Sequence, residues 1–192
     1  MPRKIFVWEA HPKSGSLCSA IADAYEKGAA SHGAEVRRMN LSEMQFSEAF
    51  QGYGASNELE PDLLTWQENL AWCDHFFLVH PYWWAAMPAR AKALLDRALT
   101  PGFAFKYHRK GVKWDKLLTG RTADAIITSD TPPWLDTLLY RKPGRRVLRN
   151  QVLDFCGIKA RRILQFGSVK LADPAKISSW ITRSEALGRA AA

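Results

Sequence analysis

The chain has 192 residues, enough for about one hydrophobic core, so we expect a single domain over residues 1–192. Its composition is 47% hydrophobic and 24% charged, which is typical of a globular protein and excludes intrinsic disorder. The formal net charge of +8 is compatible with nucleic acid, an anionic membrane surface or a phosphorylated ligand as partner, and does not choose among them.

The sequence also limits compartment and metal chemistry. No apolar run approaches the roughly 20 residues of a membrane-spanning helix, and the first residues carry no signal-peptide core, so we expect a cytoplasmic protein without membrane insertion. Cys18, Cys73 and Cys156 are odd in number and far apart, which indicates free thiols in a reducing compartment. The histidines show no metalloprotease spacing and no Gly-x-Ser-x-Gly elbow is present, so we predict neither a metal site nor a hydrolase.

Strands and helices alternate in the first half of the chain. The apolar run 4–10 predicts a strand, and three-to-four spacing of apolar side chains predicts a helix over 16–32. A second strand is expected over 35–41. Mixed polarity over 42–60 predicts a long loop, and a helix resumes over 61–71.

The same alternation continues in the second half. A buried strand is predicted over 75–79, a helix over 88–99, and a basic, aromatic loop over 100–121. The remaining expected elements are a strand at 122–128, short helices at 134–140 and 147–155, a last strand at 161–166, and a C-terminal helix capped at Asp173. Five strands separated by helices predict an α/β fold, namely a doubly wound five-stranded parallel sheet in a three-layer α/β/α sandwich.

In such a sheet, ligands bind beyond the carboxyl ends of the strands, where the strand order reverses. The loop after the first strand carries His11 and Lys13, and Ser14 and Ser16 stand where the first helix begins. Free backbone N–H groups at a helix N-terminus favour a phosphate, so this loop is a candidate anion cradle. The alternative is an ordinary N-cap at Ser16 beside a lone histidine.

The loop over 81–87 follows the third strand and places Tyr82, Trp83 and Trp84 side by side. These rings cannot all face one core, so they are candidates for a flat slot that binds a planar ring, with backbone N–H groups at its polar edge. The alternative is a hydrophobic plug or a dimer seam.

A third loop, over 128–133, is stiffened by two prolines and offers the side chains of Thr128, Ser129, Asp130 and Thr131 to a ring edge or ribityl chain. A plain turn that closes the fourth strand has the same composition.

Five motifs resemble the flavodoxin-like NAD(P)H quinone reductases, including the small bacterial modulator-of-drug-activity and potassium-efflux ancillary enzymes. They are HPKSGSLC at 11–18, PYWWAAMPARAKALLDR at 81–97, TPGFAF at 100–105, DTPPW at 130–134 and FCGIK at 155–159. The last two resemble the branch of NAD(P)H-dependent oxidoreductases. The chain departs from the family where Ser-Leu-Cys replaces Ser-Phe-Asn in the first loop. It also lacks the Gly-Gly and the Tyr and His pair of the animal enzymes, so no proton relay is carried over.

The resemblance implies one flavodoxin-like flavin-binding domain that forms a homodimer, with its two sites at the subunit interface. It implies a flavin, with FAD slightly favoured over FMN, and NADPH or NADH as electron donor. The implied cofactor-binding residues are His11, Ser16, Leu17, Cys18, Pro81, Tyr82, Trp83, Trp84, Thr128, Ser129, Asp130 and Thr131.

The expected activity is ping-pong hydride transfer from the nicotinamide through the flavin to a quinone or a similar flat acceptor. No side chain is assigned a catalytic role, and Phe105, Tyr107 and Trp134 are expected to wall the acceptor site. The basic residues of 106–116 and 141–149 either attract the phosphates of NADPH or form solvated surface. The alternative functions are a nucleic-acid-binding or regulatory module on the same fold and an ancillary subunit of a membrane transporter.

Overall fold

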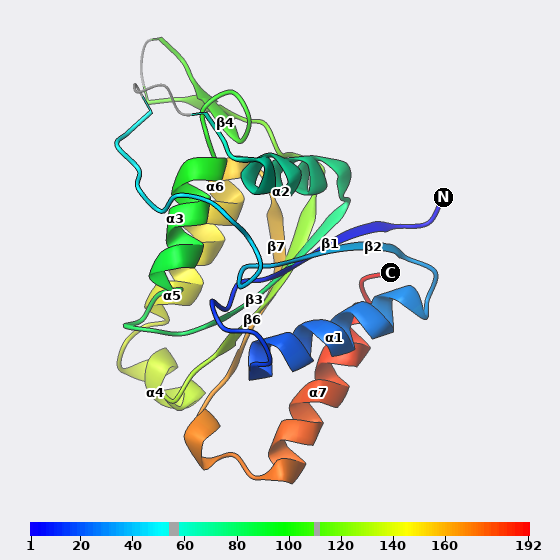
Figure 1. Cartoon of the computed structure of the whole chain (residues 1–192). Coiled ribbons are helices and arrows are strands. Elements are labelled where there is room, and N and C mark those ends of the chain that lie inside the picture. Colours follow the sequence, from blue (N-terminus) through cyan, green and yellow to red (C-terminus); the bar gives the residue numbers. More distant parts are fainter. Residues whose placement is uncertain (54–57, 110–111) are drawn as a thin grey trace.

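The computed structural model describes residues 1–53, 58–109 and 112–192. Its centre is a five-stranded, fully parallel sheet in the order β2-β1-β3-β6-β7 (Figure 1). The strands are β1 (Lys4–Glu9), β2 (Glu35–Asn40), β3 (His75–Pro81), β6 (Thr122–Thr128) and β7 (Lys159–Phe166). The predicted five-stranded parallel sheet is confirmed, and the strand order reverses between β1 and β3.

Burial on both faces explains why the central strands read as continuous apolar runs. All seven residues of β3 are buried, and so are six of the seven residues of β6. The three central strands β1, β3 and β6 pair without a register shift, with Trp8 beside Leu78 and Leu78 beside Ala125. Parallel strands covered on both sides need apolar side chains at successive positions, and this sequence supplies them.

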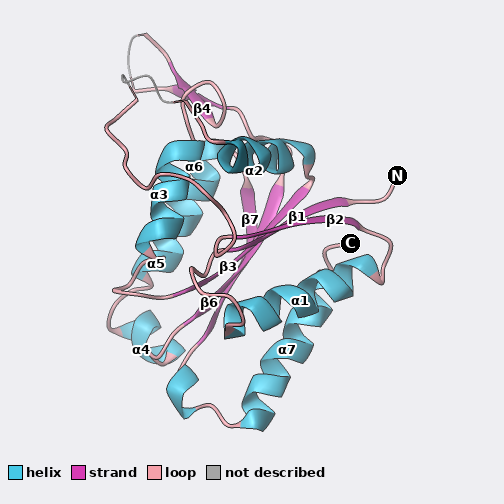
Figure 2. Cartoon of the chain, viewed as in Figure 1, coloured by secondary structure: helices cyan, strands magenta, loops and turns pink. Residues whose placement is uncertain are grey.

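Helices cover both faces of the sheet, as Figures 1 and 2 show. Helices α1 (Leu17–Ala30) and α7 (Pro174–Arg189) lie on one face, over a core that contains Ile21 and Phe77. Helices α2 (Pro61–Trp72) and α3 (Ala89–Ala98) lie on the other, over a second core around Trp8. The predicted three-layer sandwich is therefore confirmed.

Two glycines let α1 and α7 pack with their backbones almost in contact. A Cβ atom on Gly188 of α7 would lie 2.9 Å from the carbonyl carbon of Tyr25 in α1, and closer still to its oxygen. A Cβ atom on Gly28 of α1 would meet the carbonyl group of Glu185 in the same way. Real Cβ atoms do not approach backbone so closely, so this crossing requires glycine on both helices.

The prediction of a plain loop over 100–121 is wrong, because this segment contains an antiparallel hairpin. Strand β4 (Phe105–Tyr107) pairs with β5 (Trp114–Lys116). Aromatic packing accounts for it: Phe155 lies 5.1 Å from Phe105 and 4.7 Å from Trp114 between ring centroids, and the Trp114 indole N–H donates to the Phe155 carbonyl at 2.9 Å.

The short helices differ in detail from the predictions. Helix α4 spans Pro133–Leu138, and residues 143–156 form one helical stretch that comprises α5 (Pro143–Arg146), η1 (Val147–Leu153, a π-helix) and α6 (Asp154–Cys156). A 3-10 turn, η2 (Val169–Leu171), was not predicted. No helix or strand forms in the described residues of the predicted loop 42–60, of which 54–57 lie outside the described residues.

Two observations bear on the compartment predictions. None of the helices in the described ranges is long and apolar enough to cross a membrane. Cys18, Cys73 and Cys156 are all buried free thiols. Burial raises the pKa of Cys18 to about 12, so this thiol stays protonated and behaves as a small apolar side chain.

Candidate functional site

A cleft of about 200 Å³ opens at the carboxyl ends of β1, β3 and β6, beside the point where the strand order reverses. It is formed by the three loops that the sequence singles out, together with the start of the segment after β7. Its lining residues are His11, Leu17, Cys18, Pro81, Tyr82, Trp83, Thr128, Ser129, Asp130 and Val169.

The first loop ends in a capped helix whose first two residues, Leu17 and Cys18, line the cleft. The Ser16 side chain accepts from the Ser19 N–H at 3.2 Å, and the Ser19 hydroxyl accepts from the Ser16 N–H at 3.2 Å, so the two serines form a capping box. Neither the Leu17 N–H nor the Cys18 N–H has an acceptor within the described part of the chain. Two free donors at the positive end of α1 are what the predicted anion cradle requires, and the cradle itself stays a prediction.

His11 joins the first loop to the second. Its Nδ1 accepts the Lys13 N–H at 2.9 Å, and its ring packs edge-on against Trp83 with centroids 5.6 Å apart. Burial lowers the pKa of His11 below its ordinary value and outweighs the hydrogen bond from the Lys13 N–H, which acts in the opposite direction. His11 is therefore a neutral imidazole at pH 7, and the positive charge at the cradle comes from the helix end and from Lys13.

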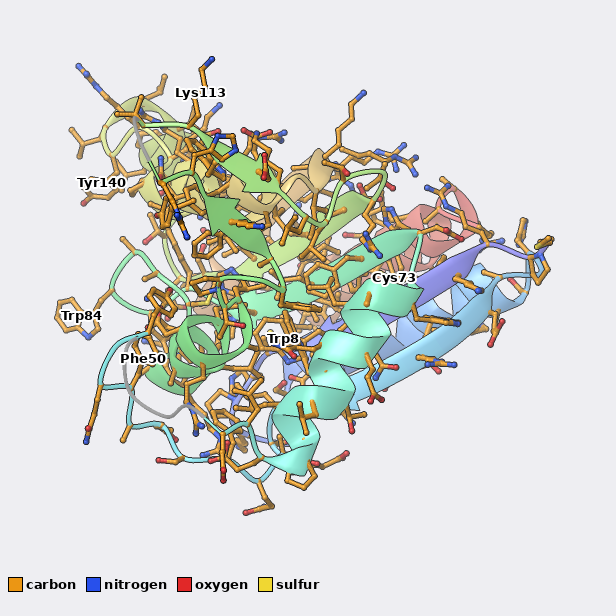
Figure 3. The ribbon with its side chains drawn as sticks, turned by 90° about the horizontal axis from the view of Figure 1, so that it is seen from above. Trp8, Phe50, Cys73, Trp84, Lys113 and Tyr140 are labelled. Carbon is orange, nitrogen blue, oxygen red and sulfur yellow. The ribbon has the colours of Figure 1, made fainter. Side chains whose placement is uncertain are left out.

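The second loop makes a tight, strained turn at the rim of the cleft. Trp83 and Ala86 exchange two backbone hydrogen bonds of 2.9 and 3.0 Å. Between them, Trp84 and Ala85 have φ angles of 51° and 60°, a left-handed conformation that non-glycine residues seldom adopt. Trp84 is completely exposed and projects from the body of the protein (Figure 3). Backbone strain of this kind is typical of functional sites.

A polar network ties the second loop to α4 and α5. The Tyr82 hydroxyl accepts the Gly144 N–H at 2.9 Å and donates to Asp136 at 3.4 Å. Asp136 is almost completely buried, and its other oxygen accepts two N–H groups of Arg145 at 2.6 and 3.2 Å. Tyr82 lines the cleft, so this network holds one wall of the site in place.

Two hydroxyl groups of the third loop, those of Thr128 and Ser129, have partners within the protein. Ser129 donates to the Thr131 carbonyl at 2.8 Å and accepts the Gln165 side-chain N–H at 2.8 Å. The Thr128 hydroxyl lies 3.4 Å from the Cys18 sulfur. These bonds fix the shape of the loop and leave these two hydroxyls little capacity for a ligand.

The structure gathers nine of the twelve predicted cofactor residues in the lining of this one cleft. The other three, Ser16, Trp84 and Thr131, belong to the same loops without lining it. Val169 was missed, because it lies in the unpredicted turn η2 and carries no chemical signal in the sequence.

The predicted acceptor residues do not lie in this cleft. Phe105 is only 5% exposed, and it lines a separate aromatic groove with Tyr107 and Phe155, between the β4–β5 hairpin and α3. Figure 1 shows β4 at the end of α3 that is remote from α4. Trp134 is 65% exposed on α4 and is not among the lining residues.

The predicted basic surface divides into two separate regions. One follows the hairpin, where Lys116 pairs with Asp154 at 3.2 Å; of this group, Lys110 lies outside the described residues. The other follows α5, where Arg141 and Arg146 border a shallow hollow with Tyr140.

Glu9 was missed by the sequence analysis, although a carboxylate in the apolar run 5–10 was a signal that could have found it. It is the last residue of β1, is 1% exposed, and has its Oε1 3.5 Å from the Ser16 hydroxyl. Burial raises the pKa of Glu9 from 4.5 to about 7. A half-ionised carboxyl group therefore lies directly behind the anion cradle at neutral pH.

Comparisons with known proteins agree with this fold. A family model described as a flavodoxin-like fold matches residues 3–186. An uncharacterised NAD(P)H oxidoreductase of Haemophilus influenzae is 29% identical over 169 residues, covering 85% of this chain and 83% of that protein. An NAD(P)H:quinone oxidoreductase from Methanothermobacter marburgensis has the same fold, with a TM-score of 0.81, 20% identity and 98% of each chain covered. An FMN-dependent NADH-azoreductase from Bacillus anthracis, in complex with FMN, gives a TM-score of 0.75 at 16% identity over all of both chains.

Proposed function

This chain belongs to the flavodoxin-like family, and from that premise we propose that it is a flavin-dependent oxidoreductase that takes electrons from NADPH or NADH. The proposed acceptor is a quinone or a similar flat molecule, reduced after the nicotinamide product has left, in a ping-pong cycle. The activities in the names of the Haemophilus and Methanothermobacter proteins support this proposal.

The observation that carries the proposal is the cleft, because its donors match the two ends of a flavin. The free N–H groups of Leu17 and Cys18 suit the phosphate. At the rim, the N–H groups of Trp84 and Ala85 also have no acceptor among the described residues, which suits the polar edge of the ring system. The aromatic wall formed by Tyr82 and Trp83 suits its flat face.

A bound flavin supplies the hydride chemistry, and the residues of this chain bind, orient and exclude water. The capped end of α1 would hold the phosphate, and neutral His11 fixes Trp83 through its edge-on contact. The Tyr82–Asp136–Arg145 network holds the wall of the slot in place, so it would restrict the orientation of a bound ring. We assign no nucleophile and no proton donor.

Several finer features belong to the same proposal. We propose FAD in preference to FMN, a cytoplasmic location, and a homodimer with the two sites at the subunit interface. The exposed rings of Trp83 and Trp84 beside the cleft, and of Tyr107 at the hairpin, support a dimer, since exposed aromatic side chains mark interaction surfaces. In such a dimer, the aromatic groove of one protomer would lie against the partner's cleft, which would give Phe105 and Tyr107 their proposed role as acceptor walls.

An absorbance spectrum of the purified protein, taken before and after addition of FAD or FMN, tests this function. We expect the two visible flavin bands to remain with the protein after gel filtration, and to bleach when NADPH or NADH is added without oxygen. Restoration of the bands by a quinone would complete the cycle. A protein that retains neither flavin contradicts the proposal.

Replacing Gly144 by alanine is expected to weaken flavin binding about tenfold, which corresponds to an overpacking cost of about 1–2 kcal/mol. The new Cβ would lie 2.8 Å from the Ala85 carbonyl oxygen and would overlap the Tyr82 ring, so it would displace both the strained turn and the cleft wall. Titration of flavin fluorescence measures the effect. Leu138→Ala, at an exposed position of the neighbouring α4, is the control and should leave the affinity unchanged. Equal affinities for Gly144→Ala and the control would show that the wall does not depend on this contact.

A further inference from the structure

The Glu9 carboxyl group is buried behind the anion cradle without a cationic partner. Glu9 ends β1 on the face covered by α1, and its polar neighbours are the Ser16 hydroxyl at 3.5 Å and the His11 backbone N–H. No Lys, Arg or His nitrogen of the described ranges lies within 4 Å of its oxygens. A buried, unpaired carboxylate is costly, so its presence at this position calls for a functional explanation.

The charged groups around Glu9 do not neutralise it. Arg38 of β2 is the nearest cation that acts on it, but the guanidinium is bonded to Asp23 and Glu26 of α1. Glu43, after β2, adds a second negative charge. On the side of the cradle, His11 is neutral, Lys13 is exposed, and the Cys18 thiol is protonated.

Ser16 connects this carboxyl group to the site. It is the N-cap of α1, and the next two residues, Leu17 and Cys18, carry the free N–H groups. A phosphate held by those N–H groups would therefore be separated from the Glu9 carboxyl by one capping residue. The negative charges of an ionised Glu9 and of such a phosphate would repel each other, because burial leaves little water to screen them.

We propose that Glu9 is a specificity-determining residue that makes the cradle discriminate between flavin phosphates by their charge. When Glu9 is ionised, it disfavours the doubly charged terminal phosphate of FMN more than the singly charged phosphates of the FAD diphosphate. When Glu9 is protonated, this discrimination is lost. The inference rests on the proposed function, because it concerns the flavin that the same cleft would bind.

The charges of FMN and FAD determine by how much, and in which direction, the ionisation of Glu9 changes their relative affinities. A terminal phosphate with a second pKa near about 6 carries close to two charges above pH 7, whereas each phosphate of a diphosphate ester carries one. With an effective dielectric constant of about 20, one additional unit charge at about 12 Å changes affinity about tenfold, and a charge nearer than that changes it more. Burial raises the pKa of Glu9 to about 7, so the relative affinity for FMN and FAD is expected to change between about pH 6 and pH 8.5.

The experiment measures the dissociation constants of FMN, FAD and riboflavin at about pH 6 and about pH 8.5 by quenching of flavin fluorescence. The ratio of the FMN constant to the FAD constant is expected to rise about tenfold with pH in the wild-type protein. In Glu9→Gln it should stay constant within about twofold. Riboflavin has no phosphate, so its affinity should not depend on Glu9 in either protein. Glu35→Gln removes an exposed carboxylate at the opposite end of β2, which does not act on Glu9, and should keep the wild-type behaviour.

Each contrary outcome has a distinct meaning. A ratio that is independent of pH in the wild-type protein, or that rises equally in Glu9→Gln, overturns the inference and leaves the proposed function standing. A change shared by riboflavin also overturns it, because the effect would then not act on the phosphate. If none of the three flavins binds, the proposed function fails and this inference fails with it. The wild-type comparison of FMN with riboflavin needs no variant, so the test holds even if Glu9→Gln does not fold.

Discussion

Replacing Gly188 by alanine is expected to destabilise the protein by about 3 kcal/mol, although the same change in an ordinary helix interior stabilises by about 1 kcal/mol. The new methyl group has no free space, because the backbone of α1 at Tyr25 occupies its position. The colliding atoms are backbone rather than the end of a flexible side chain. To admit the methyl group, α1 and α7 must therefore move apart, which opens the core around Ile21 and Trp180.

Equilibrium unfolding in urea, followed by circular dichroism, measures this effect. The matched control is Thr182→Ala, at an exposed position of the same helix, for which we expect a change within about 0.5 kcal/mol. Gly28→Ala places a methyl group on the opposite side of the same crossing and should reproduce the loss seen for Gly188→Ala. If Gly188→Ala stabilised the protein as helix propensity alone requires, the close packing of α1 on α7 would be refuted.

Replacing Glu9 by glutamine is expected to stabilise the protein by about 3 kcal/mol at pH 8.5 and by much less at pH 5. The pKa of Glu9 is raised by burial from 4.5 to about 7 in the folded protein. Between these values the folded state binds more protons than the unfolded state. The free energy of unfolding therefore falls as pH rises from about 4.5 to 7, and above the folded pKa the full cost of the buried charge is present. Glutamine keeps the shape of the side chain and removes that charge.

The measurement is the difference in unfolding free energy between variant and wild type in urea, at several values between about pH 5 and pH 8.5. Glu35→Gln serves as control, because its carboxylate is exposed at the opposite end of β2 and should give a small, nearly constant difference. A difference for Glu9→Gln that does not change with pH would mean that the carboxyl group keeps its ordinary pKa. That result would also remove the expected pH dependence of selection among flavins, because Glu9 would then stay ionised from about pH 6 to pH 8.5.

The fold and the position of the site were largely determined by the sequence. Alternation of apolar strands with amphipathic helices fixed the parallel sheet, because parallel neighbours require crossover helices and burial on both faces. The three loops at the carboxyl ends of β1, β3 and β6 were predictable for the same reason, and nine of the twelve predicted residues meet in one cleft. Turn and capping signals, such as Ser16 before α1, involve only a few neighbouring residues, so they can be recognised from the sequence alone.

Tertiary structure alone decided the features that depend on contacts between distant segments. The hairpin at 105–116 forms because Phe155, about 40 residues later, supplies a surface for its rings. Glycine is required at position 188 of α7 because the backbone of α1 crosses there and leaves no room for a side chain. Helix propensity, which disfavours glycine, does not predict such a crossing. The anomalous pKa of Glu9 arises from burial by α1 and the neighbouring strands, which an isolated carboxylate in the sequence does not reveal. Apolar patterning, turn signals and helix caps thus determined the elements and their order. Desolvation and close packing determined the chemistry of the cleft, and both require the assembled fold.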